Sequence, residues 1–140
     1  MPLSFDEAVG ALQALCQERI PPAQLLKAVV ESSHNAILSK SIDGIITSWN
    51  PAAERLFGYT AKEILGKPLT ILFPDDRKNE EEEVLKRTNK GETVDVLKTV
   101  RITKSGERIP VSIIVSPIYS VGGKIIGSSA IVQKCDWCRD

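Results

Sequence analysis

Two cysteines near the C-terminus, Cys135 and Cys138, have the spacing Cys-x-x-Cys, which permits redox or metal-binding chemistry. Such a pair can form a redox-active disulfide or supply half of a zinc site. Besides them the chain offers only Cys16 and His34 as typical zinc ligands, so a four-ligand site would require two copies of the chain. We interpret the pair as reduced thiols in a tail over residues 135–140, with a zinc- or redox-responsive switch as the alternative.

Catalytic motifs are absent from the sequence. Any Ser-His-Asp triad would have to use His34, the single histidine, and no GxSxG nucleophile elbow occurs. No GxxxxGK[ST] phosphate-binding loop occurs either. Carboxylates are plentiful, but the sequence does not show which of them share a pocket. We therefore expect a protein that is not an enzyme and interpret His34 as a surface or cap residue.

The clearest secondary-structure signals lie between residues 43 and 66. Asp43-Gly44 predicts a tight turn, because glycine adopts positive φ at little cost, and the β-branched residues of 45–49 predict a strand. Further along, the chain is predicted to form a helix over 77–89 and strands over 94–102, 108–119 and 124–133, the strands joined by short glycine-containing turns. Three successive strands with short turns form an antiparallel meander.

Two short helices are predicted between the first strand and residue 66. Asn50 can cap the first helix and Pro51 occupies its first turn, where a missing N–H does no harm. Gly58 can end that helix in the left-handed conformation. Thr60 and Glu63 then form a capping box for the second helix.

Composition indicates one globular domain. The chain has 140 residues, 42% of them hydrophobic and 26% charged, with a formal net charge of zero. Because there is no excess positive charge, a nucleic-acid partner held by bulk electrostatics is not expected. No apolar run reaches the length of a membrane span and no signal peptide is evident, so we expect a cytoplasmic protein without a membrane partner. The acidic run 80–83 is interpreted as the solvated face of a helix.

Residues 1–33 are predicted to form a helical extension. Its first helix carries an apolar stripe, and Pro21-Pro22 separates it from a second helix. An apolar helix face must be buried against another surface, here either the outer face of the sheet or a second copy of the chain, and we expect a homodimer through this stripe. The dimer-interface candidates are Phe5, Val9, Leu12, Leu15 and Cys16.

Several segments in their order and spacing resemble the PAS domain as found in bacterial sensor histidine kinases and related signalling proteins. They are DGIITSWNPAAERLFGYTAKEILG at 43–66, LFPDDR at 72–77, TVRITKSGERIPVSIIVSPI at 99–118 and GKIIGSSAIV at 123–132. The resemblance implies an α+β fold over residues 34–134, a five-stranded antiparallel sheet with short helices on one face. It also implies a sensory or protein-interaction role, with a downstream kinase or other effector as partner.

The sequence lacks the residues that bind haem or react with flavin in known types of PAS domain. One type of haem-binding PAS domain carries its axial histidine on the helix before the late strands, but residues 77–89 contain no histidine. Flavin photoreceptors of the family carry a reactive cysteine in the region corresponding to residues 66–70, which has none here. We predict no cofactor, and non-covalent haem or flavin binding stays open as the alternative.

Two hypotheses about function follow. The first is a ligand-gated sensor with a pocket between sheet and helices, and the second is a cofactor-free module for dimerisation and protein interaction. The apolar pocket candidates could equally fill a solid core. The candidates are Trp49, Leu56, Phe57, Leu72, Leu85, Val100, Ile113 and Ser129.

Overall fold

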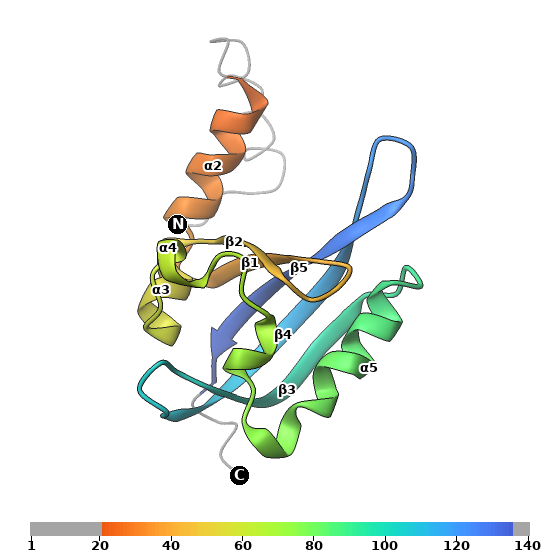
Figure 1. Cartoon of the computed structure of the whole chain (residues 1–140). Helices are drawn as coiled ribbons and strands as arrows, with labels where there is room; N and C mark the ends of the chain where they lie inside the picture. Colours follow the sequence, from red (N-terminus) through yellow and green to blue (C-terminus); the bar gives the residue numbers. More distant parts are fainter. Residues whose placement is uncertain (1–20, 136–140) are drawn as a thin grey trace. The chain divides into compact units, whose positions relative to one another are not determined.

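The computed structural model describes residues 21–135 of the chain (Figure 1). The chain forms two compact units, Met1–Ser32 and Ser33–Asp140. In the first unit the described element is helix α2 (Pro22–Ser32), which begins at the second proline of the pair and has no buried residue. The proposed interface stripe at residues 5–16 lies outside the described residues, so that interface stays a prediction.

The second unit is built on a five-stranded antiparallel sheet with the order β2-β1-β5-β4-β3. The strands are β1 (Ala36–Ser41), β2 (Ile46–Trp49), β3 (Val94–Ile102), β4 (Arg108–Tyr119) and β5 (Ile125–Lys134). The last three form the predicted meander, and β1 inserts between β5 and β2. The expected fold class, α+β with a five-stranded antiparallel sheet, is confirmed.

The segment between β2 and β3 supplies the helices, which lie over one face of the sheet (Figure 1). They are α3 (Pro51–Phe57), α4 (Ala61–Ile64), the single 3₁₀ turns η1 (Leu69–Leu72) and η2 (Asp75–Arg77), and α5 (Asn79–Thr88). Each of these elements is short. Their positions therefore depend on packing against the sheet more than on intrinsic helix stability.

The predicted caps are present. The Asn50 side chain accepts a hydrogen bond from the amide of Ala53 at 2.9 Å, and Gly58 ends α3 at φ +85°. The same Asn50 oxygen accepts from the Ile37 amide at 2.9 Å, so this residue also ties α3 to β1. The capping box of α4 is complete in both directions between Thr60 and Glu63.

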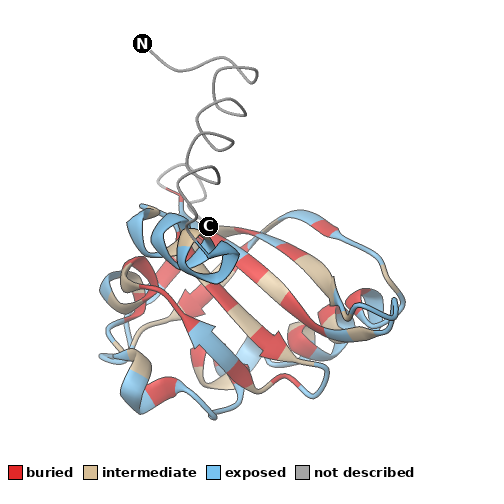
Figure 2. Ribbon diagram, turned by 90° about the horizontal axis from the view of Figure 1, so that it is seen from above, coloured by how far each residue is buried: buried red, intermediate tan, exposed pale blue. Residues whose placement is uncertain are grey.

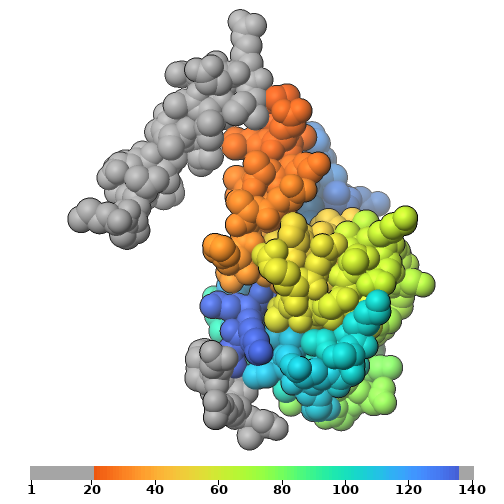
Figure 3. Space-filling view, turned by 90° about the vertical axis from the view of Figure 1, so that its left-hand side faces the viewer, coloured from red at the N-terminus to blue at the C-terminus, as the bar shows by residue number. Residues whose placement is uncertain are grey.

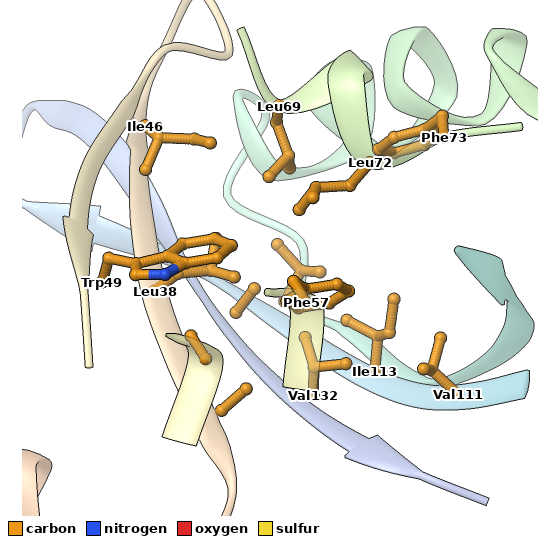
Figure 4. Close-up of a cluster of buried hydrophobic side chains, with 14 of the residues drawn as sticks. Leu38, Ile46, Trp49, Phe57, Leu69, Leu72, Phe73, Val111, Ile113 and Val132 are labelled. Carbon is orange, nitrogen blue, oxygen red and sulfur yellow. The ribbon is translucent and has the colours of Figure 1, made fainter. Parts of the chain in front are cut away.

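The hydrophobic core lies between the sheet and the helices (Figures 2 and 4). Phe57 of α3 is at its centre and packs against Trp49 with ring centroids 5.5 Å apart. The sheet contributes a set of alternating inward side chains, namely Leu38, Ile46, Val111, Ile113, Val115, Ala130 and Val132. The alternation leaves the other side chains of these strands on the opposite face of the sheet.

Strand β3 departs from the expected alternation. A bulge between Val94 and Leu97 shifts the register with β4, and Val96 sits there at φ +52°. Beyond the bulge the inward residues are Thr99 and Arg101, both buried. The expectation that Val100 faces the interior is therefore wrong, because one additional residue exchanges the two faces of the strand after Val94.

Candidate functional site

A small cavity of about 30 Å³ lies inside the second unit, between the sheet and the helices. This volume holds one or two water molecules, whereas pockets for drug-sized ligands are roughly ten times larger. Most of the wall is apolar, and three residues in it carry charge. The lining consists of Leu38, Lys40, Phe57, Leu69, Leu72, Phe73, Glu81, Val84, Leu97, Arg101, Ile113, Val115, Ala130 and Val132.

The first charged contact in the cavity wall joins Lys40 of β1 to Glu81 of α5. Lys40 follows Ala36 and Leu38 on the inward face of the strand, and its Nζ lies 2.5 Å from Glu81 Oε1. The two residues are only 2% and 5% exposed. The second carboxylate oxygen of Glu81, Oε2, is buried and has no hydrogen-bond partner among the described residues.

A second ionic group lies beside the first, centred on Glu80 of α5. Its carboxylate accepts from the Thr99 hydroxyl at 2.8 Å, from Arg101 at 3.0 Å and from Arg77 at 3.1 Å. The guanidinium of Arg101 also lies 3.7 Å above the ring of Phe73, a cation–π geometry. We refer to Lys40, Glu81, Glu80, Thr99 and Arg101 together as the inner ionic cluster.

Burial and pairing shift the pKa values of the cluster in different directions. Burial lowers the pKa of Lys40 and raises the pKa of Glu81, and in each case this outweighs the attraction between the two. Burial also acts to raise the pKa of Glu80, but the hydrogen bonds from Thr99, Arg101 and Arg77 hold it below the ordinary value. The Lys40–Glu81 pair is therefore costly to keep charged, while Glu80 is stabilised as an anion.

The inner ionic cluster joins helix α5 to the sheet. Of its ten residues only Glu81, Val84 and Thr88 are buried, so Val84 is its single fully buried apolar side chain. The prediction that residues 80–83 form a solvated face is therefore wrong for Glu80 and Glu81. The spacing 81, 84, 88 is that of one helix face, and it was the signal that could have revealed the buried glutamate.

The eight predicted pocket residues separate into four groups. Phe57, Leu72 and Ile113 line the cavity, and Trp49 is in the adjoining core, where its Nε1 donates to the Tyr59 carbonyl at 3.0 Å. Leu56 and Leu85 are half-buried and do not line it. The placement of Val100 and Ser129 in the lining was wrong: the β3 bulge and the β5 alternation direct Thr99, Arg101, Ser128 and Ala130 inward instead.

The sequence-predicted metal and redox candidates lie away from this cavity. Cys135 is buried, its amide donates to the Pro110 carbonyl at 3.0 Å, and it is disulfide-bonded. The interpretation of Cys135 as a reduced thiol in a tail was therefore wrong. Cys138 and Cys16 lie outside the described residues. His34 is exposed just before β1, and residues 21–135 contain no cluster of side chains that could hold a metal ion.

The interior does not fit a haem or a flavin. A cavity of about 30 Å³ cannot admit either group while α5 is in place, and α5 supplies no histidine. Over residues 21–135 no helix is long and apolar enough to cross a membrane.

Comparison with known proteins places the chain in a family. The model of the family described as PAS fold matches residues 24–134. Mouse high affinity cAMP-specific and IBMX-insensitive 3',5'-cyclic phosphodiesterase 8A is 32% identical over 112 residues, 76% of this chain and 13% of that protein. The Escherichia coli signal transduction histidine-protein kinase AtoS is 28% identical over 131 residues, 94% of this chain and 21% of that protein. The chain thus spans about a fifth or less of the length of these relatives.

Solved structures agree in fold. A PAS domain from Colwellia psychrerythraea superposes with a TM-score of 0.73 at 22% identity, covering 82% of this chain and 98% of that one. An RNA-binding light-oxygen-voltage receptor gives a TM-score of 0.70 at 21% identity, covering 82% of this chain and 34% of that one. At these identities the likeness concerns the fold alone.

Proposed function

The chain belongs to the PAS family, and from that premise we propose that it is the regulatory module of a longer signalling protein whose signal acts on the inner ionic cluster. PAS modules of sensor kinases serve sensory signal transduction, and the chain corresponds to such a module in AtoS. The finer part of the proposal is where the signal is received. We place it at the contact between α5 and the sheet.

The observation that carries this proposal is the way α5 is attached. A helix held by one buried valine and two ionic groups depends on the charges that face it. The buried Lys40–Glu81 pair makes this attachment sensitive, because a buried charge that loses its partner costs free energy. A ligand or partner that re-pairs Lys40 or Glu81 would therefore shift the position of α5.

Hydrogen exchange tests whether the cluster controls α5. Glu81→Gln keeps the size of the side chain and removes its charge, so we expect the α5 amides to exchange faster while the amides of α3 keep their protection. Glu82→Gln is the matched control, because Glu82 is its exposed neighbour on the same helix. Equal α5 protection in wild type and Glu81→Gln would contradict the proposal.

A second candidate function is that of a homodimerising interaction module. The sheet face opposite the helices carries a row of isoleucines in cross-strand register, Ile37 beside Ile131 and Ile131 beside Ile114. Ile114 and Ile131 are 37% and 41% exposed. Helix α2, described by itself, has no buried residue and exposes Leu26 and Val29. Two uncovered apolar surfaces support association with a second copy or with an effector domain.

Light scattering tests the dimer. Leu12→Glu places a charge in the stripe expected to form the interface, and Ile114→Glu places one in the isoleucine row. If the wild type is a dimer, we expect at least one of these variants to be shifted towards monomer. A monomeric wild type at high concentration would rule out the homodimer and would mean that the stripe packs within its own subunit.

A further inference from the structure

A second hollow lies on the surface of the sheet unit, separate from the interior cavity. It is an open groove of about 720 Å³ where the end of α3, the β3–β4 turn and the end of β5 meet; Figure 3 shows the face on which these three segments adjoin. Leu56 and Ile109 contribute apolar surface to it. Its volume lies within the range of small-molecule sites, about 300–1,000 Å³.

The walls of the groove are held together by backbone contacts. The Lys104 amide in the β3–β4 turn donates to the Phe57 carbonyl at the end of α3 at 2.8 Å. Glycine is favoured at position 58 because its φ is +85°, a backbone conformation that other residues adopt only with strain. The turn itself is closed by the Thr103 amide donating to the Glu107 carbonyl at 2.9 Å. The groove is thus formed before any ligand arrives.

The groove concentrates positive charge. Three cationic side chains, those of Arg55, Lys104 and Lys134, line it against the single carboxylate of Glu107, in a chain with a formal net charge of zero. Lys104 is paired with a glutamate of α4 at 3.0 Å. Arg55 and Lys134 are exposed, and no ion pair joins either of them to a carboxylate among the described residues. A preformed hollow with two uncompensated cations and an apolar wall attracts negative charge.

We propose that this groove binds an organic anion, a phosphate or carboxylate head group carried on an apolar body. The head group is held by Arg55 and Lys134, whose donors match anionic oxygens. The apolar body lies over Leu56 and Ile109. This site goes beyond the proposed function, because none of the inner ionic cluster lines it.

Three naphthalene probes distinguish the contribution of the anionic head group to binding from that of the apolar rings. 1-Naphthyl phosphate and 1-naphthoate carry an anionic group, whereas 1-naphthol presents the same rings with a neutral hydroxyl. We expect NMR titrations to show saturable shifts at the Gly58, Ser105 and Lys134 amides with one or both anions, and binding of 1-naphthol weaker by about tenfold. The tighter of the two anions identifies the head group. Equal affinity for 1-naphthol would overturn the proposal.

Charge-removing variants test the two cations directly. Arg55→Gln and Lys134→Gln should each weaken binding of the tighter anion by about two- to fivefold, the scale of exposed charge pairs. Lys90→Gln removes an exposed charge outside the groove and should leave affinity unchanged. For the wild type, raising the salt from about 50 to about 300 mM should weaken anion binding and leave 1-naphthol unaffected. Unchanged affinity in both groove variants, or no salt effect, would overturn the proposal.

Discussion

The Lys40–Glu81 pair is the contact whose removal should most affect this fold. Lys40→Met leaves the Glu81 carboxylate without its partner inside the core, and Glu81→Leu leaves the Lys40 ammonium in the same condition. Both residues are nearly inaccessible to bulk solvent, so the remaining charge is poorly solvated. Each single change should lower the free energy of unfolding by about 3–5 kcal/mol.

The double variant Lys40→Met/Glu81→Leu should behave very differently. It removes both charges and fills the same space with apolar atoms beside Leu38 and Val84, which already line the cavity. Replacement of a complete buried pair in this way is commonly neutral or stabilising. For a domain of about 100 residues, the single changes correspond to a fall in Tm of at least roughly 12 °C, while the double variant should melt near or above the wild type.

The two single variants should respond to pH in opposite directions. Without Glu81, the pKa of Lys40 is lowered by burial, so the folded state binds fewer protons than the unfolded chain as pH rises towards 10.5. Glu81→Leu should therefore recover stability in alkaline solution. Without Lys40, the raised pKa of Glu81 makes the folded state bind more protons above pH 4.5. Lys40→Met should therefore be most stable in mildly acidic solution and lose stability as pH rises.

Urea unfolding followed by circular dichroism, at several pH values, measures all four proteins. A coupling energy of several kcal/mol between the two positions is expected from the double-mutant cycle. If a single variant does not fold at neutral pH, its recovery at the favourable pH still gives the comparison. Additive losses in the double variant, or parallel pH profiles in the single variants, would refute this account of the pair.

Three further predictions concern the sheet and can be checked by the same unfolding assay. Val96→Asn should raise the free energy of unfolding by about 1 kcal/mol, because asparagine tolerates the positive φ that a β-branched residue does not. A loss of stability would contradict the inference that the Val96 backbone is strained. Gly127→Ala should lower the free energy of unfolding by about 1–3 kcal/mol, since the new Cβ would lie 2.3 Å from a carbonyl oxygen of β1. An unchanged free energy of unfolding would show that β1 and β5 can move apart to admit the methyl group. Thr99→Val should cost about 1–2 kcal/mol by removing a donor to Glu80. Because the pKa of Glu80 is lowered in the folded state, the stability lost in Thr99→Val should be fully lost above pH 4.5, and the difference from the wild type should shrink as pH falls below that value. A difference that does not change with pH would contradict the role of Thr99 as a donor to the Glu80 carboxylate.

The local elements of this protein could be predicted from sequence because their signals are short in range. Asn50, Gly58 and the Thr60–Glu63 box each act within four residues, and the structure contains all of them as expected. The same holds for β4, whose bounds at residues 108–119 agree with the prediction. Such features depend on backbone geometry and on hydrogen bonds between residues close in sequence, so the same short motif forms the same cap in different proteins.

The faces of the strands were predicted less well. Val100 was expected to line the pocket, but the bulge at Val96 reverses the faces, and Thr99 and Arg101 occupy the interior instead. Nothing in the local sequence marks this bulge, since valine is a poor residue for positive φ. The pairing of β3 with β4 imposes it, and that pairing is a property of the whole sheet.

The candidate site itself was decided by tertiary structure. Sequence determined the fold class, the caps and the absence of a histidine on α5, and it could place Glu81 on the same helix face as Val84. It could not show that this face meets Lys40, which lies 41 residues earlier in the chain. Whether a glutamate is solvated or buried depends on what the fold brings against it. Local patterns carry no information about such a distant partner, and only the packing of α5 on β1 and β3 supplies it.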